Sequence, residues 1–181
     1  MTDTLEERYT TLCTQPSDIV LHLPRFVQLC LDLNAQHVIE LGSRSGVSTV
    51  AWLYGLAQTG GRLTSVDLAP APEIGVWPHW SHIQGNDLDE VIVGKLDPAD
   101  IVFIDTSHAY EQTCKELDTY RHLVKPGGLI ACHDTTLRFP EDAPPSDPDF
   151  PVRRAIERFV KEHELDWLNI PECYGLGLIK V

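Results

Sequence analysis

The sequence predicts an α/β protein in which helices cover both faces of a doubly wound sheet. Short apolar runs alternate with segments of helical periodicity, which is the pattern of β-α-β units and a parallel sheet. Two of these runs, within residues 99–108 and 126–135, are short, apolar and bounded by turn residues, as in strands buried on both faces. With 181 residues and 43% hydrophobic content, the chain is expected to form a single Rossmann-like domain over residues 1–181.

The N-terminal part is expected to hold a polar arm, a helix and the first strand. Residues 1–16 are polar and predict a short helix or a flexible arm. Ser17 and Asp18 mark the start of a helix, because apolar residues follow them at helical spacing, and Pro24 predicts a kink in it. The run HVIEL at 37–41 predicts the first buried strand.

The next elements continue the alternation. VSTVAWLYGLAQT at 47–59 predicts a helix, which two glycines end. RLTSVDL at 62–68 predicts the second strand, and a proline-rich loop follows it at 69–80. SHIQG at 81–85 predicts the third strand and NDLDEVIVGKL at 86–96 a short helix.

The second half of the chain repeats the pattern and then changes it. ADIVFID at 99–105 and GLIACHD at 128–134 predict the fourth and fifth strands, with an amphipathic helix at 110–124 between them. Residues 135–151 are rich in proline and acid and have no structural period, which is typical of a lid loop or a disordered segment. A helix is expected at 152–164.

The C-terminus predicts a departure from the parallel sheet. Residues 166–170 and 176–181 read as two strands around the turn PECYG. Two strands joined by so short a turn pair antiparallel. We therefore expect a mostly parallel sheet with a C-terminal antiparallel strand.

The acidic composition limits the partners that the chain can have. The formal net charge is −13, which disfavours nucleic acid and anionic membranes, because both require a basic surface. No apolar run approaches the length of a membrane span, and the start MTDTLEERYT lacks the apolar region of a signal peptide. The five cysteines form no CxxC pair, so neither a zinc module nor a disulfide framework is predicted. We expect a cytoplasmic protein.

Two of the apolar strands end in an aspartate with a histidine close by. The run ADIVFIDTSH places Asp105 and His108 after the fourth strand, and GLIACHDT places His133 and Asp134 at the end of the fifth. In an open α/β sheet, ligands bind at the carboxyl ends of the strands. These four residues are therefore the first candidates for chemistry.

A glycine turn joins the first strand to the following helix. Gly42 permits a tight turn and a close approach of a ligand to the backbone, and Gly46 does the same at the helix start. The free N–H groups of a helix N-terminus suit a carboxylate or a phosphate, and Ser48 and Thr49 add hydroxyl donors. The turn has neither the GxGxxG pattern nor the lysine of a P-loop, so by itself it also fits a plain structural turn.

Two acids beside this turn favour one cofactor. Glu40 ends the first strand and would repel a pyrophosphate but attract an ammonium group. Asp67 ends the second strand, where an acid would hold a ribose diol. A ligand with an amine, a carboxylate and a ribose fits this pair better than NAD does, and S-adenosylmethionine is such a ligand.

Three motifs in order carry a family resemblance. The chain reads ELGSRSGVST at 40–49, IDTSHAYE at 104–111 and LVKPGGLIACHD at 123–134. Together they resemble the class I S-adenosylmethionine-dependent methyltransferases, and more narrowly the small O-methyltransferases of methyltransferase family 24 and of the catechol type. Arg44 stands where many methyltransferases have a glycine, at a position that is free in the narrower group. The resemblance implies O-methylation of a small-molecule hydroxyl.

The same resemblance implies a set of cofactor contacts. The implied cofactor-binding residues are Glu40, Gly42, Ser43, Ser48, Asp67, Asn86, Asp87 and Asp105. The residues around the glycine turn would surround the methionine part, and Asp67 would bind the ribose hydroxyls. Asn86 and Asp87 would lie by the adenine, or would instead cap the helix that follows them.

The catechol-type enzymes imply a metal site and a base. They bind the metal through an aspartate after the fourth strand and an adjacent acid–amide pair after the fifth, and a lysine three residues beyond the first aspartate takes the proton. Asp105 matches the first position, His133 and Asp134 match the pair, and His108 matches the base. A divalent cation lowers the pKa of a bound hydroxyl, whose proton a histidine could accept near neutral pH.

The ligand set leaves three points open. Nitrogen from His133 suits manganese, iron or zinc better than magnesium. His133 could instead meet the substrate directly and act as the base in place of His108. A third alternative is that Asp105 contacts only the cofactor and that the histidines are ordinary loop residues.

Two other function classes are compatible with the residues. A metal-dependent hydrolase could use Asp105, His133 and Asp134 without S-adenosylmethionine, although the acids around the glycine turn disfavour it. A non-catalytic cofactor-binding module or partner subunit fits a short chain without an inserted substrate cap, although the polar strand ends argue against it. The sequence does not reveal the oligomeric state, although a small enzyme often completes its site with a second subunit, so a homo-oligomer is left open.

Overall fold

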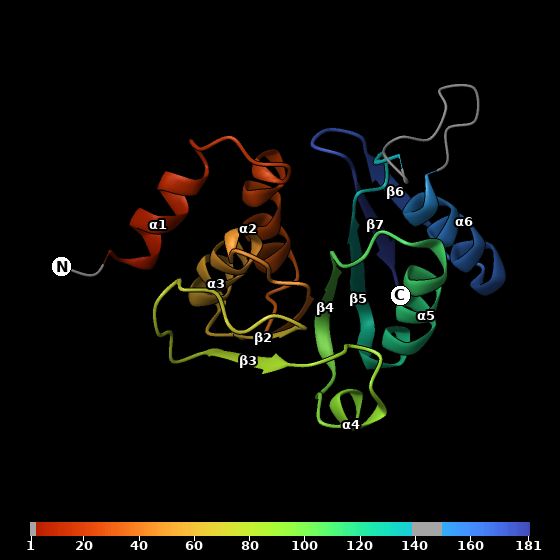
Figure 1. Ribbon diagram of the computed structural model, residues 1–181, viewed down its shortest axis with the longest axis horizontal. Helices are drawn as coiled ribbons and strands as arrows, with labels where there is room; N and C mark the ends of the chain where they lie inside the picture. Colours follow the sequence, from red (N-terminus) through yellow and green to blue (C-terminus); the bar gives the residue numbers. More distant parts are fainter. Residues whose placement is uncertain (1–2, 139–149) are drawn as a thin grey trace.

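The computed structural model describes residues 3–138 and 150–181, and these residues form a seven-stranded sheet (Figure 1). The strand order is β3-β2-β1-β4-β5-β7-β6. The first five strands are parallel, β7 is antiparallel to β5, and β6 is antiparallel to β7. The mostly parallel sheet with an antiparallel C-terminal end is therefore confirmed. The strands are β1 (His37–Leu41), β2 (Arg62–Asp67), β3 (Trp80–Gln84), β4 (Ala99–Ile104), β5 (Val124–His133), β6 (Trp167–Ile170) and β7 (Leu176–Lys180).

Helices cover both faces of this sheet, as predicted. Figure 1 shows α1, α2 and α3 on one side of the sheet and α5 and α6 on the other. The helices are α1 (Leu5–Leu12), α2 (Leu23–Asp32), α3 (Val47–Thr59), α4 (Glu90–Val93), α5 (Tyr110–Tyr120) and α6 (Pro151–His163), with 3-10 turns η1 (Val20–His22) and η2 (Arg121–Leu123).

The apolar strands contribute to two cores, one on each face. Successive residues of β1 point to opposite faces: Val38 packs with Phe26 and Trp52, and Ile39 packs with Leu117. All five side chains of β1 are buried, and each such burial of a large apolar side chain contributes about 1.5–3 kcal/mol. This explains why the strands read as continuous apolar runs.

The N-terminal helices differ from the sequence expectation at one point. The segment after Asp18 is a 3-10 turn followed by α2, and Pro24 lies in the first turn of α2 instead of kinking a longer helix. A proline is tolerated there because the first N–H groups of a helix have no intrahelical partner. Of the two alternatives for residues 1–16, the structure has the helix, with Thr4 and Glu7 forming a capping box at its start.

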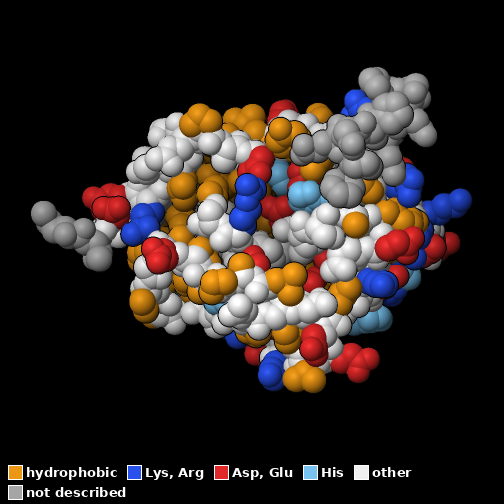
Figure 2. All heavy atoms as spheres, in the orientation of Figure 1, with side chains coloured by type: hydrophobic (Ala, Val, Ile, Leu, Met, Phe, Trp, Pro, Cys, Tyr) orange, Lys and Arg blue, Asp and Glu red, His pale blue; other side chains and the backbone are white. Residues whose placement is uncertain are grey.

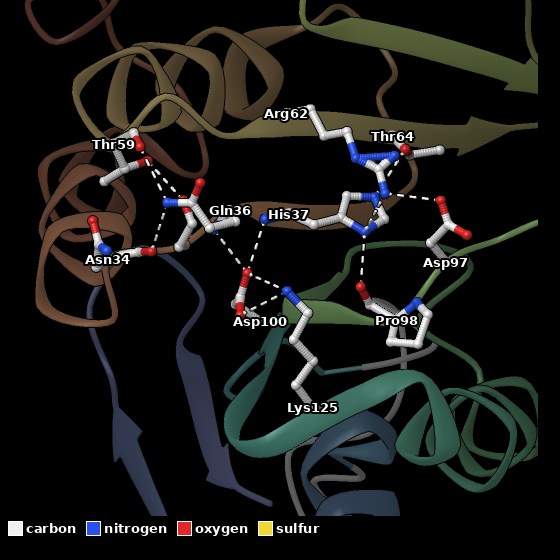
Figure 3. Close-up of polar contacts among 11 residues, drawn as sticks. Asn34, Gln36, His37, Thr59, Arg62, Thr64, Asp97, Pro98, Asp100 and Lys125 are labelled. Atoms are coloured by element: carbon white, nitrogen blue, oxygen red, sulfur yellow. Dashed lines mark hydrogen bonds and ion pairs between the residues drawn. The ribbon is translucent and has the colours of Figure 1, made fainter.

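A polar network holds the amino ends of the parallel strands, opposite the carboxyl ends that carry the candidate site residues (Figure 3). The carboxylate of Asp100 accepts the backbone N–H groups of Gln36 and His37 at 2.7 and 2.8 Å and pairs with Lys125 at 3.0 Å. The ring of His37 contacts Thr64 at 3.0 Å. These contacts tie β1, β2, β4 and β5 together at their starts.

Two further expectations concern the lid loop and membrane spans. The lid loop expected at 135–151 lies largely in residues 139–149, which are outside the described residues. Among the described residues, no helix is long and apolar enough to cross a bilayer.

Candidate active site

A cavity of about 820 Å³ opens at the carboxyl ends of the parallel strands. It lies where β1 separates β2 from β4, the switch point at which α/β sheets bind ligands. Figure 2 shows acidic and histidine side chains gathered in a hollow of this face. The predicted residues that line the cavity are Gly42, Ser43, Ser48, Asp67, Asn86, Asp87, Asp105, His108 and Asp134. Glu40 and His133 are not in the cavity wall.

The glycine turn lies directly against the end of β4. Gly42 has a φ of +84° and its N–H donates to the carbonyl of Val66 at 2.9 Å. A Cβ at this position would overlap the backbone oxygen of Asp105. The turn thus needs a glycine for its conformation and for the close approach of two backbones.

Asp67 fixes the turn from the end of β2. Its Oδ2 accepts the backbone N–H groups of Ser43 and Arg44 at 2.7 and 2.9 Å, and its Oδ1 accepts that of Ala69 at 2.8 Å. Burial by itself raises the pKa of Asp67, but these N–H donors hold it below its usual range. An ionised carboxylate is therefore kept at the cavity wall beside the glycine turn.

Glu40 has a different position from the one expected. Its carboxylate is fully buried and accepts the hydroxyl protons of Ser48, Thr49 and Ser65 at 2.7, 2.8 and 2.6 Å. Burial raises the pKa of Glu40 to about 7 in spite of these donors. The expectation that Glu40 faces an ammonium group of the cofactor is corrected: it joins the first turn of α3 to β2 behind the cavity.

Glu40→Gln is expected to remove a pH dependence of stability. The pKa of the folded-state group is raised from 4.5 to about 7, so its contribution is fully present below pH 4.5 and is lost as the pH rises to about 7. As the pH rises from about 4.5 to 8, the wild type should therefore lose roughly 2–3 kcal/mol of unfolding free energy relative to the Glu40→Gln variant. Urea unfolding at several pH values measures it.

The control for this experiment is Glu90→Gln, which removes an exposed carboxylate. Its unfolding free energy should follow that of the wild type across the same pH range. A constant difference between wild type and Glu40→Gln would contradict the assignment.

At the other end of the cavity, Asn86 and Asp87 differ in their surroundings. The Asn86 side chain accepts the N–H of Leu88 at 2.9 Å, which is a local turn contact, and Asp89 caps α4. Asp87 is buried, and Gln112 of α5 donates to it at 3.4 Å. Neither residue is therefore the N-cap of α4: Asn86 makes a turn contact before the helix, and Asp87 faces α5.

His108 joins the two strand ends. Its Nε2 lies 2.8 Å from Asp134 Oδ2 and 3.6 Å from Asp105 Oδ1. Hydrogen bonds to these two carboxylates raise the pKa of His108 to about 9 against the effect of burial. His108 and Asp134 have φ values of +58° and +64°, a left-handed conformation that is costly for non-glycine residues and is often found at functional sites.

His133 lies behind the two carboxylates. Its Nε2–H donates to the carbonyl of Cys173 at 2.9 Å, and its Nδ1 lies 3.2 Å from Asp134. Burial by itself lowers the pKa of His133, but hydrogen bonds to Asp105 and Asp134 raise it to about 10. A charged and buried His133 balances the two carboxylates and is shielded from a substrate in the cavity.

The candidate metal ligands in the structure differ from the expected set by one histidine. Ligand atoms of Asp105, His108 and Asp134 all lie within 4.8 Å of one another, and each of these residues lines the cavity. The expected set contained His133 in place of His108. Two carboxylates and one imidazole still form a mixed oxygen and nitrogen set, which suits manganese, iron or zinc.

Several cavity residues did not stand out in the sequence. The wall also contains Asp18 and Ile19 before α2, Gln112 of α5, and Tyr174 from the turn between β6 and β7. Gln112 could have been inferred, because it lies in the first turn of α5, only four residues after His108. Tyr174 could not, since no local pattern brings a C-terminal hairpin to this edge.

The doubly wound sheet, the glycine turn after β1 and the acid-ended strands together define the class I methyltransferase architecture. The model of a methyltransferase-domain family, family 24, matches residues 39–135, more than half of the chain. The chain belongs to this family. The resemblance to O-methyltransferases drawn from the three motifs is thereby confirmed, and the metal-dependent hydrolase alternative is not favoured.

Individual proteins agree with this assignment. The O-methyltransferase ankF of Aspergillus thermomutatus is 25% identical over 87% of this chain and 77% of its own length. The methyltransferase PaMTH1 of Podospora anserina, solved with S-adenosylhomocysteine, has a TM-score of 0.68 at 19% identity, covering 99% of this chain and 88% of that one. The methyltransferase MycE of the mycinamycin pathway, solved with Mg, S-adenosylhomocysteine and mycinamycin VI, has a TM-score of 0.73 at 18% identity over 97% of this chain and 52% of that one.

Proposed function

We propose that the protein transfers the methyl group of S-adenosylmethionine to a hydroxyl oxygen of a small molecule. One observation carries the proposal: a single cavity joins the glycine turn and Asp67 on one side to Asp105, His108 and Asp134 on the other. The first side suits an amino acid and a ribose, and the second suits an acceptor hydroxyl. The O-methyltransferase relatives support both the cofactor and the O-methyl chemistry.

The residues of the cofactor side have distinct roles in this proposal. The methionine part lies against Gly42, Ser43 and the first turn of α3, where backbone N–H groups suit its carboxylate. Asp67 is ionised and accepts the ribose hydroxyls, in addition to the N–H groups that it already accepts. Asp87 lies toward the adenine.

The residues of the acceptor side would position and deprotonate the hydroxyl. His108 lies in the cavity wall, and in its neutral form it takes the proton of the acceptor hydroxyl during transfer. Because its pKa is about 9, the neutral form and the rate of transfer should increase as the pH rises toward about 9. Asp134 orients the ring of His108, and His133 holds the two carboxylates from behind. Alignment of the hydroxyl with the methyl group supplies several kcal/mol of the rate enhancement.

Asp105, His108 and Asp134 also fit a divalent cation as part of this proposal. When bound, such a cation would lower the pKa of the acceptor hydroxyl. With a cation at this site, His108 would serve either as a ligand or as a base. The Mg in the MycE structure supports metal assistance in this fold.

The cofactor test is calorimetric titration with S-adenosylhomocysteine. The wild type should bind, and Asp67→Asn should bind at least about tenfold more weakly, because it loses a charged acceptor of hydrogen bonds. Asp97→Asn is the matched control, since Asp97 lies at the amino edge and pairs only with Arg62 among the described contacts. Absence of binding of S-adenosylmethionine and S-adenosylhomocysteine to the wild type, with or without metal, would refute the proposed function.

The metal test is titration with Mn²⁺. Asp134→Asn should weaken Mn²⁺ binding by roughly 10–100-fold, because it removes one carboxylate from a set of three ligands. The variant keeps the size of the side chain, and Asp97→Asn again serves as the control. Equal Mn²⁺ affinity of Asp134→Asn and the wild type would remove Asp134 from the ligand set.

Location and partners complete the proposal. We propose a cytoplasmic enzyme, because all five cysteines are free and suit a reducing compartment. Its partner is a small-molecule acceptor, and the net charge of −13 disfavours nucleic acid and anionic membranes.

A further inference from the structure

Two carboxyl groups lie together beneath the adenine end of the cavity. Asp87 follows β3 and Glu116 lies on α5, and their exposed fractions are 8% and 0%. Glu116 Oε1 accepts the hydroxyl of Thr106 at 2.7 Å and the amide of Gln112 at 2.9 Å. Tyr120 donates its hydroxyl to the backbone oxygen of Asp87 at 2.7 Å. The pair is therefore held from the loop after β4 and from two turns of α5.

The remaining oxygen of each carboxyl indicates how the pair is satisfied. Within the described part of the chain, Asp87 Oδ2 and Glu116 Oε2 are buried and receive no hydrogen from a protein donor. Leaving two buried carboxylate oxygens unsatisfied would be costly. A single proton on Glu116 Oε2, donated to Asp87, satisfies both atoms.

The surroundings favour this protonated form. Burial and the contact with Asp87 raise the pKa of Glu116 to about 8. The other titratable groups facing the pair are Tyr120 on α5 and Cys132 on β5, and burial raises the pKa of each, so both are uncharged. Near neutral pH the pair then carries one negative charge, and no cation among these groups compensates a second.

We propose that Glu116 is a positioning residue for the cofactor, which holds Asp87 and Gln112 at the cavity wall by sharing one proton with Asp87. Asp87 and Gln112 line the cavity, whereas Glu116 does not. Glu116 acts on the ligand only through these two side chains. The inference rests on the proposed function, in which Asp87 lies toward the adenine.

The shared proton makes cofactor affinity depend on pH. While Glu116 is protonated, Asp87 is fixed and remains a negatively charged acceptor for an amine on the adenine ring. When Glu116 loses the proton, two buried carboxylates repel each other and Asp87 leaves this position. Affinity for the cofactor should fall as the pH rises above about 8.

The experiment is titration of S-adenosylhomocysteine binding between about pH 6 and 9 with the wild type, Glu116→Gln and Glu111→Gln. A glutamine at 116 donates an N–H to Asp87 at every pH, and Glu111 is an exposed acid on the same helix. Because the amine of the ligand also titrates in this range, the informative quantity is the ratio of wild-type to Glu116→Gln dissociation constants. This ratio should stay near one at about pH 6–7 and rise about tenfold by about pH 9. Glu111→Gln should follow the wild type.

Each outcome has a distinct meaning. If the wild type binds and the ratio stays constant across the titration, Glu116 is a packing residue and the inference is wrong. If the wild type does not bind at any pH, the proposed function fails instead. Infrared spectroscopy provides an independent measurement. Since buried Glu40 also titrates near pH 7, the spectra are recorded on the Glu40→Gln variant, where a protonated carboxyl band at neutral pH that titrates near pH 8 is expected; its absence would overturn the inference.

Discussion

His108→Gln is expected to reduce methyl transfer by about 100-fold or more, the largest catalytic effect of any single change in the cavity. Among the described histidines, only His108 both contacts the two strand-end carboxylates and lines the cavity. Glutamine can keep a hydrogen bond to Asp134 but cannot accept a proton at any pH, whereas His108 accepts one in its neutral form, with a pKa of about 9. The measurement is release of S-adenosylhomocysteine, with the acceptor that a screen of phenolic and sugar hydroxyls provides.

The same variant separates the two roles of His108. If His108 is a base and not a ligand, His108→Gln leaves Mn²⁺ affinity unchanged. If His108 is a ligand, the variant binds Mn²⁺ more weakly. Affinity for S-adenosylhomocysteine should stay within a few-fold of the wild type in both cases. His79→Gln is the control, since His79 is exposed in the loop after β2 and lies outside the cavity wall. Full transfer activity in His108→Gln at neutral pH would rule out the base.

Gly42→Ala is expected to have the largest effect on stability, a loss of about 3 kcal/mol or more in unfolding free energy. Its φ of +84° is strained for alanine, and the added Cβ would overlap the backbone oxygen of Asp105. Backbone cannot rotate away as a side chain can, so the end of β4 must move. Since Asp105 is the first candidate ligand, S-adenosylhomocysteine and Mn²⁺ binding should weaken together.

Gly60→Ala provides a matched control for the conformational strain. Gly60 ends α3 with a φ of +74°, and an added Cβ there has no neighbour within 4 Å among the described residues. It should lose only about 1 kcal/mol. Urea unfolding measures both variants. Equal losses for Gly42→Ala and Gly60→Ala would show that the close approach of the turn to Asp105 has no energetic consequence.

Much of the fold could be predicted because its signals are local. β4 is an apolar run of a few residues, β1 and β5 contain such runs, and the glycine turn at Gly42 directly follows β1. The extent of α4 was harder to predict, because Asn86 forms a turn contact with the backbone that competes with helix formation, and the helix begins only after the N-cap Asp89. The start of α2 at Leu23 likewise depends on where Pro24 can be accommodated.

The sequence predicted which residues lie at the candidate site better than it predicted what each of them does there. Nine of the eleven predicted residues line one cavity, because the carboxyl ends of parallel strands meet at one edge of the sheet. Glu40 was misassigned because its three hydroxyl partners come from α3 and β2, and sequence alone does not show which face of β1 they cover.

The sequence by itself determined the class of fold, the glycine turn after the first strand and the two acid-ended strands. Local residue patterns encode these features, and parallel pairing then brings them together. Only the tertiary structure decided which histidine faces the cavity. The carbonyl of Cys173, forty residues after His133, binds the Nε2–H of His133 and turns this ring behind the carboxylates, which leaves His108 beside them in the cavity wall. That contact depends on the packing of a C-terminal hairpin against β5, and no pattern in the chain around either histidine specifies it.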